Sequence, residues 1–184
     1  MNGRFAALAL VLFLGVPGAE GAWYRSVVAT APATLADVVV SSAGASGKWR
    51  VYGVAGDTVY EYDWSGSSWT RRGIASVGPG NMTTGIAAGV GRNDGKVRLY
   101  VSHTKFGPVK GSLYELSYDT MTQAWGAREM LGPLGTGESF TDVALSTGSI
   151  PNEPPPTRIR VYGSNGNGKA YVFTYAPETD SWPG

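Results

Sequence analysis

The sequence predicts an all-β fold built from β-propeller blades, each of four antiparallel strands. Tryptophans recur at one point of a repeated strand pattern, at Trp23, Trp69, Trp125 and Trp182. They lie about fifty residues apart, and the intervals carry short apolar runs bounded by glycine-rich turns, which is typical of propeller repeats. No helical periodicity of apolar residues follows the N-terminal segment. We therefore expect about three blades in this chain, either as a partial propeller or as half of a six-bladed dimer.

Three copies of the strand pattern align along the chain. The first strands are expected at 37–41, 85–89 and 141–145, the second at 49–52, 97–100 and 159–162, and the third at 58–62, 112–116 and 169–173. An arginine holds the same position in every second strand, and β-branched and aromatic residues dominate all of these runs. A tryptophan then opens the fourth strand. The repeat units are predicted at roughly 35–78, 79–135 and 136–184, within a repeat region over 22–184.

The two ends of the repeat region complement each other. Residues 22–30 resemble a fourth strand without the preceding three, and the last unit reaches Trp182 without its fourth strand. Propellers often close by pairing such ends, because pairing removes exposed sheet edges. Three units are fewer than the roughly four to eight blades of a ring. The expectation is a homodimer that closes a six-bladed ring, with 22–30 as the complementing strand; a piece of a longer array and an open stack of three blades are the alternatives.

Residues 1–21 have the layout of a secretory signal peptide. A basic start at Arg4 precedes an apolar run over 5–16 and small residues around Gly21. The run is shorter than the about 20 residues of a membrane helix, and no second apolar segment follows. We expect cleavage near Gly21, a secreted, periplasmic or extracellular location, and no membrane span in the mature chain. An uncleaved anchor is the alternative.

Composition argues against several classes of function. The chain has 15 Lys and Arg against 14 Asp and Glu, a formal net charge of +1, so no basic face for nucleic acid is expected. It has no cysteine and one histidine, His103, which is a poor donor set for zinc, thiol or Ser-His-Asp chemistry. His103 is interpreted as a surface or turn residue. No cofactor and no metal are predicted.

Paired carboxylates are the remaining route to catalysis, as general acid and base. The candidates are Glu61, Asp63, Glu115, Asp119 and Glu138. Their spacing singles out no pair. No catalytic residue is therefore predicted, and a fragment of a propeller hydrolase or lyase is kept as an alternative.

One polar set repeats with the strands and is the candidate ligand site. It combines the arginine of the second strand, a glutamate of the third and the tryptophan that opens the fourth. Its members are Arg50, Glu61 and Trp69, then Arg98, Glu115 and Trp125, then Arg160 and Trp182, with Val172 in place of the third glutamate. Arginine and glutamate can bind vicinal sugar hydroxyls while the sugar ring stacks on an indole. Alternatively, arginine and glutamate form ion pairs between strands and tryptophan fills the core between blades.

The order Arg-Val-Tyr over 50–52, Tyr-Glu over 60–61 and then Trp69 resembles the repeat of the six-bladed fucose-binding lectins of fungi and bacteria. In that family, arginine, glutamate and tryptophan at such positions hold the sugar between adjacent blades, and some members build the ring from several short chains. The resemblance covers all three units. It implies carbohydrate binding without catalysis, a dimer, and a weakened or absent third site at Val172.

Two further resemblances concern the same repeats. Residues 118–125 and especially 175–182 are similar to kelch repeats, although the paired glycines of kelch blades are missing. The segment 91–100 resembles a repeat of uncharacterised exported bacterial propellers. The kelch likeness implies a scaffold that binds proteins, which is the alternative function. All of these likenesses imply one fold, and one fold can carry many different sites.

Overall fold

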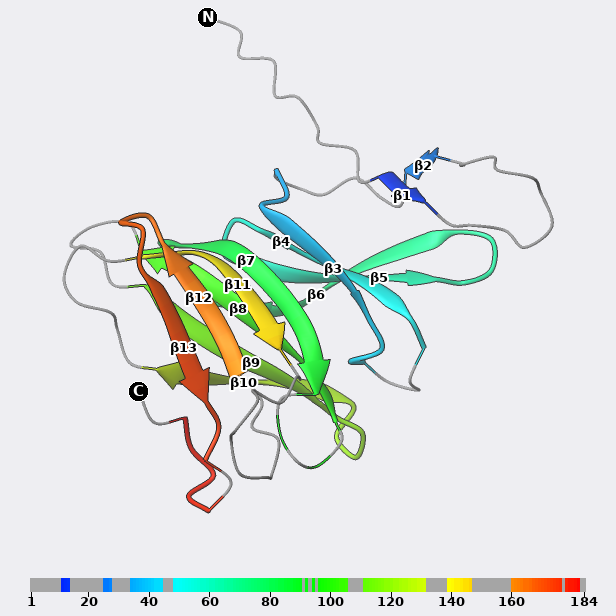
Figure 1. Cartoon of the computed structure of the whole chain (residues 1–184). Helices are drawn as coiled ribbons and strands as arrows, with labels where there is room; N and C mark the ends of the chain where they lie inside the picture. The colour runs from blue at the N-terminus through cyan, green and yellow to red at the C-terminus, as the bar shows by residue number, and fades with distance from the viewer. Residues whose placement is uncertain are drawn as a thin grey trace, which may run out of the picture.

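The computed structural model of the chain is all-β, as predicted (Figure 1). It describes residues 11–13, 25–27, 34–44, 48–90, 92, 94, 96–105, 111–131, 139–146, 160–176 and 178–182. No helix occurs among these residues, so none of them belongs to a helix long and apolar enough to cross a membrane. The strands alternate with short turns, as the glycine-bounded apolar runs require.

Three antiparallel sheets follow one another along the chain, and in each the spatial order of the strands is their sequence order. The first sheet holds β3 (Asp37–Ser41), β4 (Arg50–Ala55), β5 (Thr58–Trp64) and β6 (Trp69–Ser76). The second sheet holds β7 (Asn81–Val90), β8 (Val97–Lys105), β9 (Ser112–Asp119) and β10 (Ala124–Leu131). The third sheet holds β11 (Phe140–Ser146), β12 (Arg160–Asn165) and β13 (Ala170–Thr174).

The strand register agrees with the alignment of the three units. The tyrosine of each second strand lies opposite the same position of each third strand, in the pairs Tyr52–Glu61, Tyr100–Glu115 and Tyr162–Val172. Because the side chains of a strand alternate between its two faces, aligned positions point to equivalent faces of the three sheets. The described part of the third sheet has three strands, and Trp182 follows it after a bridge between Ala176 and Ser181.

A separate two-stranded sheet joins β1 (Val11–Phe13) to β2 (Arg25–Val27). The first of these strands belongs to the predicted signal peptide, and the second to the segment 22–30 that was expected to complete the last unit. The remainder of both segments, with Trp23 and the cleavage point near Gly21, lies outside the described residues.

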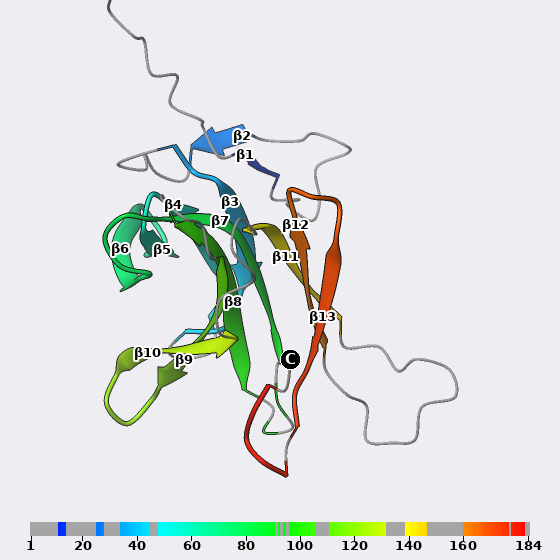
Figure 2. The same ribbon diagram turned by 90° about the vertical axis from the view of Figure 1, so that its left-hand side faces the viewer.

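The three large sheets stack face to face through their first strands. β7 contacts β3 on one side and β11 on the other, and the later strands diverge from this centre (Figure 2). One apolar core lies between the first and second sheets and contains Tyr52, Val54, Val59, Leu99, Val101 and Leu116. A second core, between the second and third sheets, contains Tyr100, Leu113, Phe140, Val161, Phe173 and Trp182. The described residues form a stack of sheets and no closed ring.

The prediction that His103 is a surface or turn residue is wrong. The side chain is only 4% exposed, and its ring lies 5.2 Å from that of Tyr114. The ladder between β7 and β8 continues to Lys105. His103 is therefore an interior position of the second sheet, between Thr83 of β7 and Ser112 of β9.

Candidate functional site

An arginine, a tyrosine and a glutamate form a buried cluster on one face of the first sheet. Arg50 and Tyr52 are alternate residues of β4, and Glu61 lies opposite Tyr52 on β5, so all three share a face. Arg50 Nε lies 3.7 Å from Glu61 Oε2, and the Tyr52 hydroxyl donates a hydrogen bond of 3.3 Å to the same oxygen. Burial, and after it the charge of Glu61, raises the pKa of Tyr52. The hydroxyl is therefore a donor at neutral pH.

The tryptophan that meets this cluster comes from the next sheet. Trp69 lies on the opposite face of the first sheet, where it pairs with Trp64 at 5.4 Å between ring centres. The indole against Tyr52 is that of Trp125 on β10, at 5.8 Å and an angle of 75° between the rings. The grouping of Trp69 and Trp125 with the arginine and glutamate of their own units is therefore wrong. Trp69 lies opposite Trp64, and Trp125 lies opposite Tyr118, in each case on the sheet face away from the glutamate.

A cavity of about 360 Å³ opens beside this cluster, between the first two sheets. Its lining residues are Arg50, Glu61, Asp63, Thr70, Arg71, Arg72 and Tyr118. Tyr118 belongs to β9, and its ring lies 5.6 Å from that of Trp125. We call this cavity, with the adjoining Tyr52 and Trp125, the first inter-sheet site. Both neighbouring sheets contribute to it.

The charges of the first inter-sheet site are arranged around Glu61. Arg72 Nη2 donates a hydrogen bond of 2.8 Å to Glu61 Oε1, although the Arg72 side chain is 58% exposed. Arg50 Nε also lies 3.5 Å from Asp63 Oδ1. The site thus presents guanidinium donors and carboxylate acceptors together, with one aromatic wall. Arg72 is the exposed member of its pair with Glu61, whereas the carboxylate is buried.

The second and third sheets form an equivalent cluster. Arg98 Nε lies 3.7 Å from Glu115 Oε1, and the Tyr100 hydroxyl donates to Glu115 Oε2 at 3.5 Å. The indole of Trp182, in the segment after β13, lies 6.0 Å from the Tyr100 ring, at an angle of 79°. Tyr175 lies 5.3 Å from Trp182. We call these five residues the second inter-sheet site.

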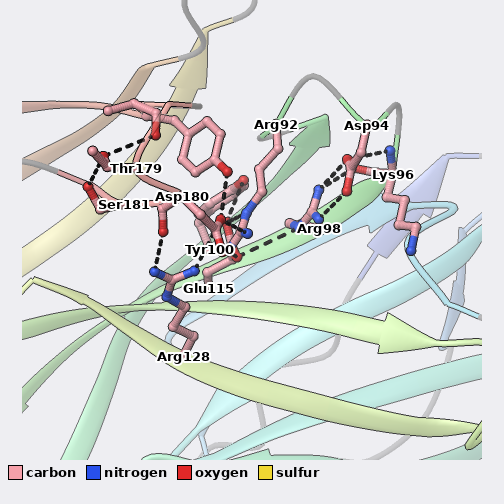
Figure 3. A network of polar contacts seen from close by, with 12 residues as sticks. Arg92, Asp94, Lys96, Arg98, Tyr100, Glu115, Arg128, Thr179, Asp180 and Ser181 are labelled. Carbon is pink, nitrogen blue, oxygen red and sulfur yellow. Dashed lines mark hydrogen bonds and ion pairs between the residues drawn. The ribbon is translucent and has the colours of Figure 1, made fainter.

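The second inter-sheet site is occupied by Arg92 from the connection between β7 and β8 (Figure 3). Arg92 Nε donates to Glu115 Oε2 at 3.2 Å and Nη2 donates to Glu115 Oε1. Arg92 Nη1 donates to Asp180 Oδ1 at 2.6 Å, and the guanidinium lies 5.0 Å from the ring centre of Tyr175. Glu115 is thereby bound by a partly buried guanidinium from the same chain.

Arg98 is held in the same network by Asp94. Its Nη1 and Nη2 donate to the two oxygens of that carboxylate at 2.8 and 2.6 Å. These hydrogen bonds hold the pKa of Asp94 down at about 2. Both partners are therefore charged at neutral pH, and the second inter-sheet site is closed by ion pairs within the chain.

The third arginine, Arg160, holds the equivalent position of the third sheet, but its surroundings differ from those of Arg50 and Arg98. Arg160 itself is buried, but Val172 stands where the other units have glutamate and is 53% exposed. Trp182, grouped with Arg160 by the sequence, contributes instead to the second inter-sheet site.

Several residues of the two sites were not predicted. Tyr52 and Tyr100 recur in the Arg-x-Tyr pattern of the second strands, so the repeat itself carried a signal for them. Tyr118 and Tyr175 each stand seven residues before a tryptophan, which is a second repeated feature. Arg92 has no counterpart in the other units. No repeat could therefore have revealed its role.

The predicted carboxylate candidates separate in the structure. Glu61 and Asp63 line one cavity, whereas Glu115 is closed off and Asp119 accepts a backbone hydrogen bond from Met121 at 2.8 Å. Glu138 lies outside the described residues. Among the residues that are described, no three His, Cys, Asp or Glu side chains gather as metal ligands would.

Comparison with known proteins returned no relative: no protein-family model matches the chain, and no curated protein is similar to it. The chemistry of the first inter-sheet site is therefore the basis of the functional argument.

Proposed function

We propose that the protein is a secreted, non-catalytic module that binds carbohydrate in the first inter-sheet site. The observation that supports this most is the lining of the cavity. Arg50 and Glu61 are buried polar groups of fixed position, and Tyr118 adds an aromatic wall from the next sheet. The cavity volume of about 360 Å³ lies within the about 300–1,000 Å³ of small-molecule sites.

This lining suits the polar and apolar parts of a sugar. Adjacent hydroxyls can donate to carboxylate oxygens of Glu61 or Asp63 and accept from guanidinium groups, in the geometry of charge-assisted hydrogen bonds. The C–H face of a pyranose can pack on the ring of Tyr118. Arg72 is the exposed donor to Glu61, so a saccharide hydroxyl can take its place as a donor to that carboxylate.

Arg50→Ala is expected to weaken saccharide binding about 10- to 100-fold, because one charge-assisted hydrogen bond contributes about 1.5–3 kcal/mol. A glycan array identifies the sugar, and calorimetry with methyl α-L-fucoside is the first quantitative measurement because of the lectin resemblance. Arg98→Ala is the matched control: it changes the equivalent arginine of the closed site and should leave binding unchanged. Folding of each variant is checked by circular dichroism.

Two results would contradict the proposal. A folded wild-type protein that binds no sugar on the array would favour the protein-binding scaffold instead. Equal binding by Arg50→Ala and the wild type would remove the first inter-sheet site as the location, even if a sugar binds.

We further propose that the three sheets are propeller blades and that a second copy of the chain completes a six-bladed ring. The support is that the same packing of one sheet on the next occurs twice within one chain. The face with Tyr52 is covered by the second sheet, and the face with Tyr100 by the third. On the equivalent face of the third sheet, beside Tyr162, the side chain of Val172 is 53% exposed. A second copy offers a sheet of the required kind.

The mature protein is accordingly expected to sediment at twice the mass of one chain, and to dissociate on dilution. Analytical ultracentrifugation over a range of micromolar concentrations measures this. Val172→Arg, which puts a charge on the exposed face, should shift the population to the monomer. A folded wild-type monomer at every concentration would contradict the ring and would favour an open stack of three sheets.

A further inference from the structure

We infer that the second inter-sheet site is a latent copy of the first saccharide site, closed from within the chain by the side chain of Arg92. The inference rests on the proposed function of the first site. It assigns to Arg92 the role of an internal occupant: the second site would accept the same saccharide once that side chain is absent. The chain as it stands then binds one saccharide, although its fold provides two sites.

The two sites match position by position. The equivalent residues are Arg50 and Arg98, Tyr52 and Tyr100, Glu61 and Glu115, Tyr118 and Tyr175, and Trp125 and Trp182. The distance from the arginine Nε to the glutamate is 3.7 Å in both. The tyrosine and tryptophan rings meet edge to face in both, at 5.8 and 6.0 Å. Even the residue two before each tryptophan has the same left-handed backbone, with φ of 54° at Gln123 and 46° at Asp180.

The connection between the first two strands of the sheet differs between the sites. Ser41 to Arg50 in the first sheet and Gly89 to Arg98 in the second are connections of equal length, so Gly44 stands where the second sheet has Arg92. A Cβ at Gly44 would lie 2.8 Å from Glu61 Oε2 and from the Tyr52 hydroxyl oxygen. A side chain at this position therefore points directly at the glutamate. The first site has no side chain there, and one could be added only if Glu61 or Tyr52 shifted.

Arg92 makes the contacts that a planar polar ligand would make. Its guanidinium hydrogen-bonds the buried carboxylate of Glu115 on β9, lies over the Tyr175 ring and binds Asp180, so two separate segments hold it, and its side chain is only 15% exposed. The arginine of the fourth strand has a different partner in each site. Arg72 binds the glutamate of the first site, whereas its equivalent Arg128 donates to the backbone oxygen of Asp180 at 2.5 Å. A saccharide cannot reach Glu115 while Arg92 remains.

A reciprocal pair of substitutions tests the inference. Arg92→Gly reproduces the connection of the first site, and Gly44→Arg reproduces that of the second. Isothermal calorimetry with methyl α-L-fucoside, or with the sugar that gives the strongest array signal, measures the number of sites. We expect one per chain for the wild type, two for Arg92→Gly and none for Gly44→Arg. A folded Arg92→Gly protein that still binds one saccharide would overturn the inference, as would a folded Gly44→Arg protein that keeps its single site.

A second probe separates this inference from the proposed function. Methylguanidinium has the shape and charge of the removed group. Its binding would report on the cavity whether or not the protein binds a saccharide. At millimolar concentration it should raise the Tm of Arg92→Gly by about 2–4 °C and leave the wild type unchanged. If the wild type binds no sugar while methylguanidinium stabilises the variant, the occupied cavity is supported and the saccharide proposal fails. If methylguanidinium gives no stabilisation, Arg92 is not an occupant of a preformed site. If Arg92→Gly does not fold, Gly44→Arg decides through the loss or retention of binding.

Discussion

Glu115→Ala is expected to lower the free energy of unfolding by about 3–5 kcal/mol, because removal of one member of a buried ion pair leaves charge uncompensated. Glu115 is 2% exposed and faces both the partly buried Arg92 and the buried Arg98. Without the carboxylate, the ion pairs that remain among the described residues are that of Arg92 with the exposed Asp180 and that of Arg98 with Asp94. Urea denaturation at neutral pH, followed by circular dichroism, measures the loss.

Two control substitutions give this prediction its specificity. Glu115→Gln keeps the shape and one acceptor, and should cost less than the alanine variant. Glu61→Ala changes the equivalent residue of the open site, where Arg72 is exposed and Arg50 retains Asp63. Glu61→Ala should therefore lower the free energy of unfolding by less than Glu115→Ala does. Equal losses at Glu61 and Glu115 would contradict the difference between the open and closed sites.

Leu99→Ala should destabilise the protein by about 2–5 kcal/mol, the range for removing a large buried aliphatic side chain. Leu99 is fully buried in the core between the first two sheets, with Val54 and Val59 as members of the same cluster. The substitution leaves a cavity that the stacked strands can close only in part. Thermal and urea unfolding of the variant measure the effect.

Met121→Ala is the control for the core substitution. Met121 is 93% exposed in the turn between β9 and β10, and surface changes of this kind usually stay within about 0.5 kcal/mol. A cost below about 1 kcal/mol for Leu99→Ala would mean that the first two sheets do not pack in solution as they do in the structure.

Much of the fold follows from local sequence pattern. The apolar runs, the turns between them and the repeated arginine predict the strands and align the three units, and the register of Tyr52 with Glu61 and of Tyr100 with Glu115 agrees with that alignment. Alternation along a strand is a property of neighbouring residues, so it can be recognised without knowledge of the tertiary structure. The proximity of Arg50 and Glu61 was predicted for the same reason.

Contacts between sheets could not be predicted in this way. The sequence placed Trp125 beside Glu115 of its own unit, whereas the ring meets Tyr52 of the preceding one. The error arises because the repeat specifies which residues share a strand, but not which face of a sheet its neighbour covers. His103 was misplaced for a related reason: the length of the β7–β8 ladder, not the residue type, decides its burial.

The chain therefore encodes its strands, their register and two equivalent Arg–Tyr–Glu clusters in its local pattern, since backbone pairing and side-chain alternation act over a few residues. Which cluster is open depends on the folded molecule. Gly44 and Arg92 occupy equivalent positions in connections of equal length, and the consequence of that difference appears only when the third sheet brings Tyr175 and Asp180 against the second. The residue difference between Gly44 and Arg92 is local, but only long-range packing turns it into one open site and one closed site.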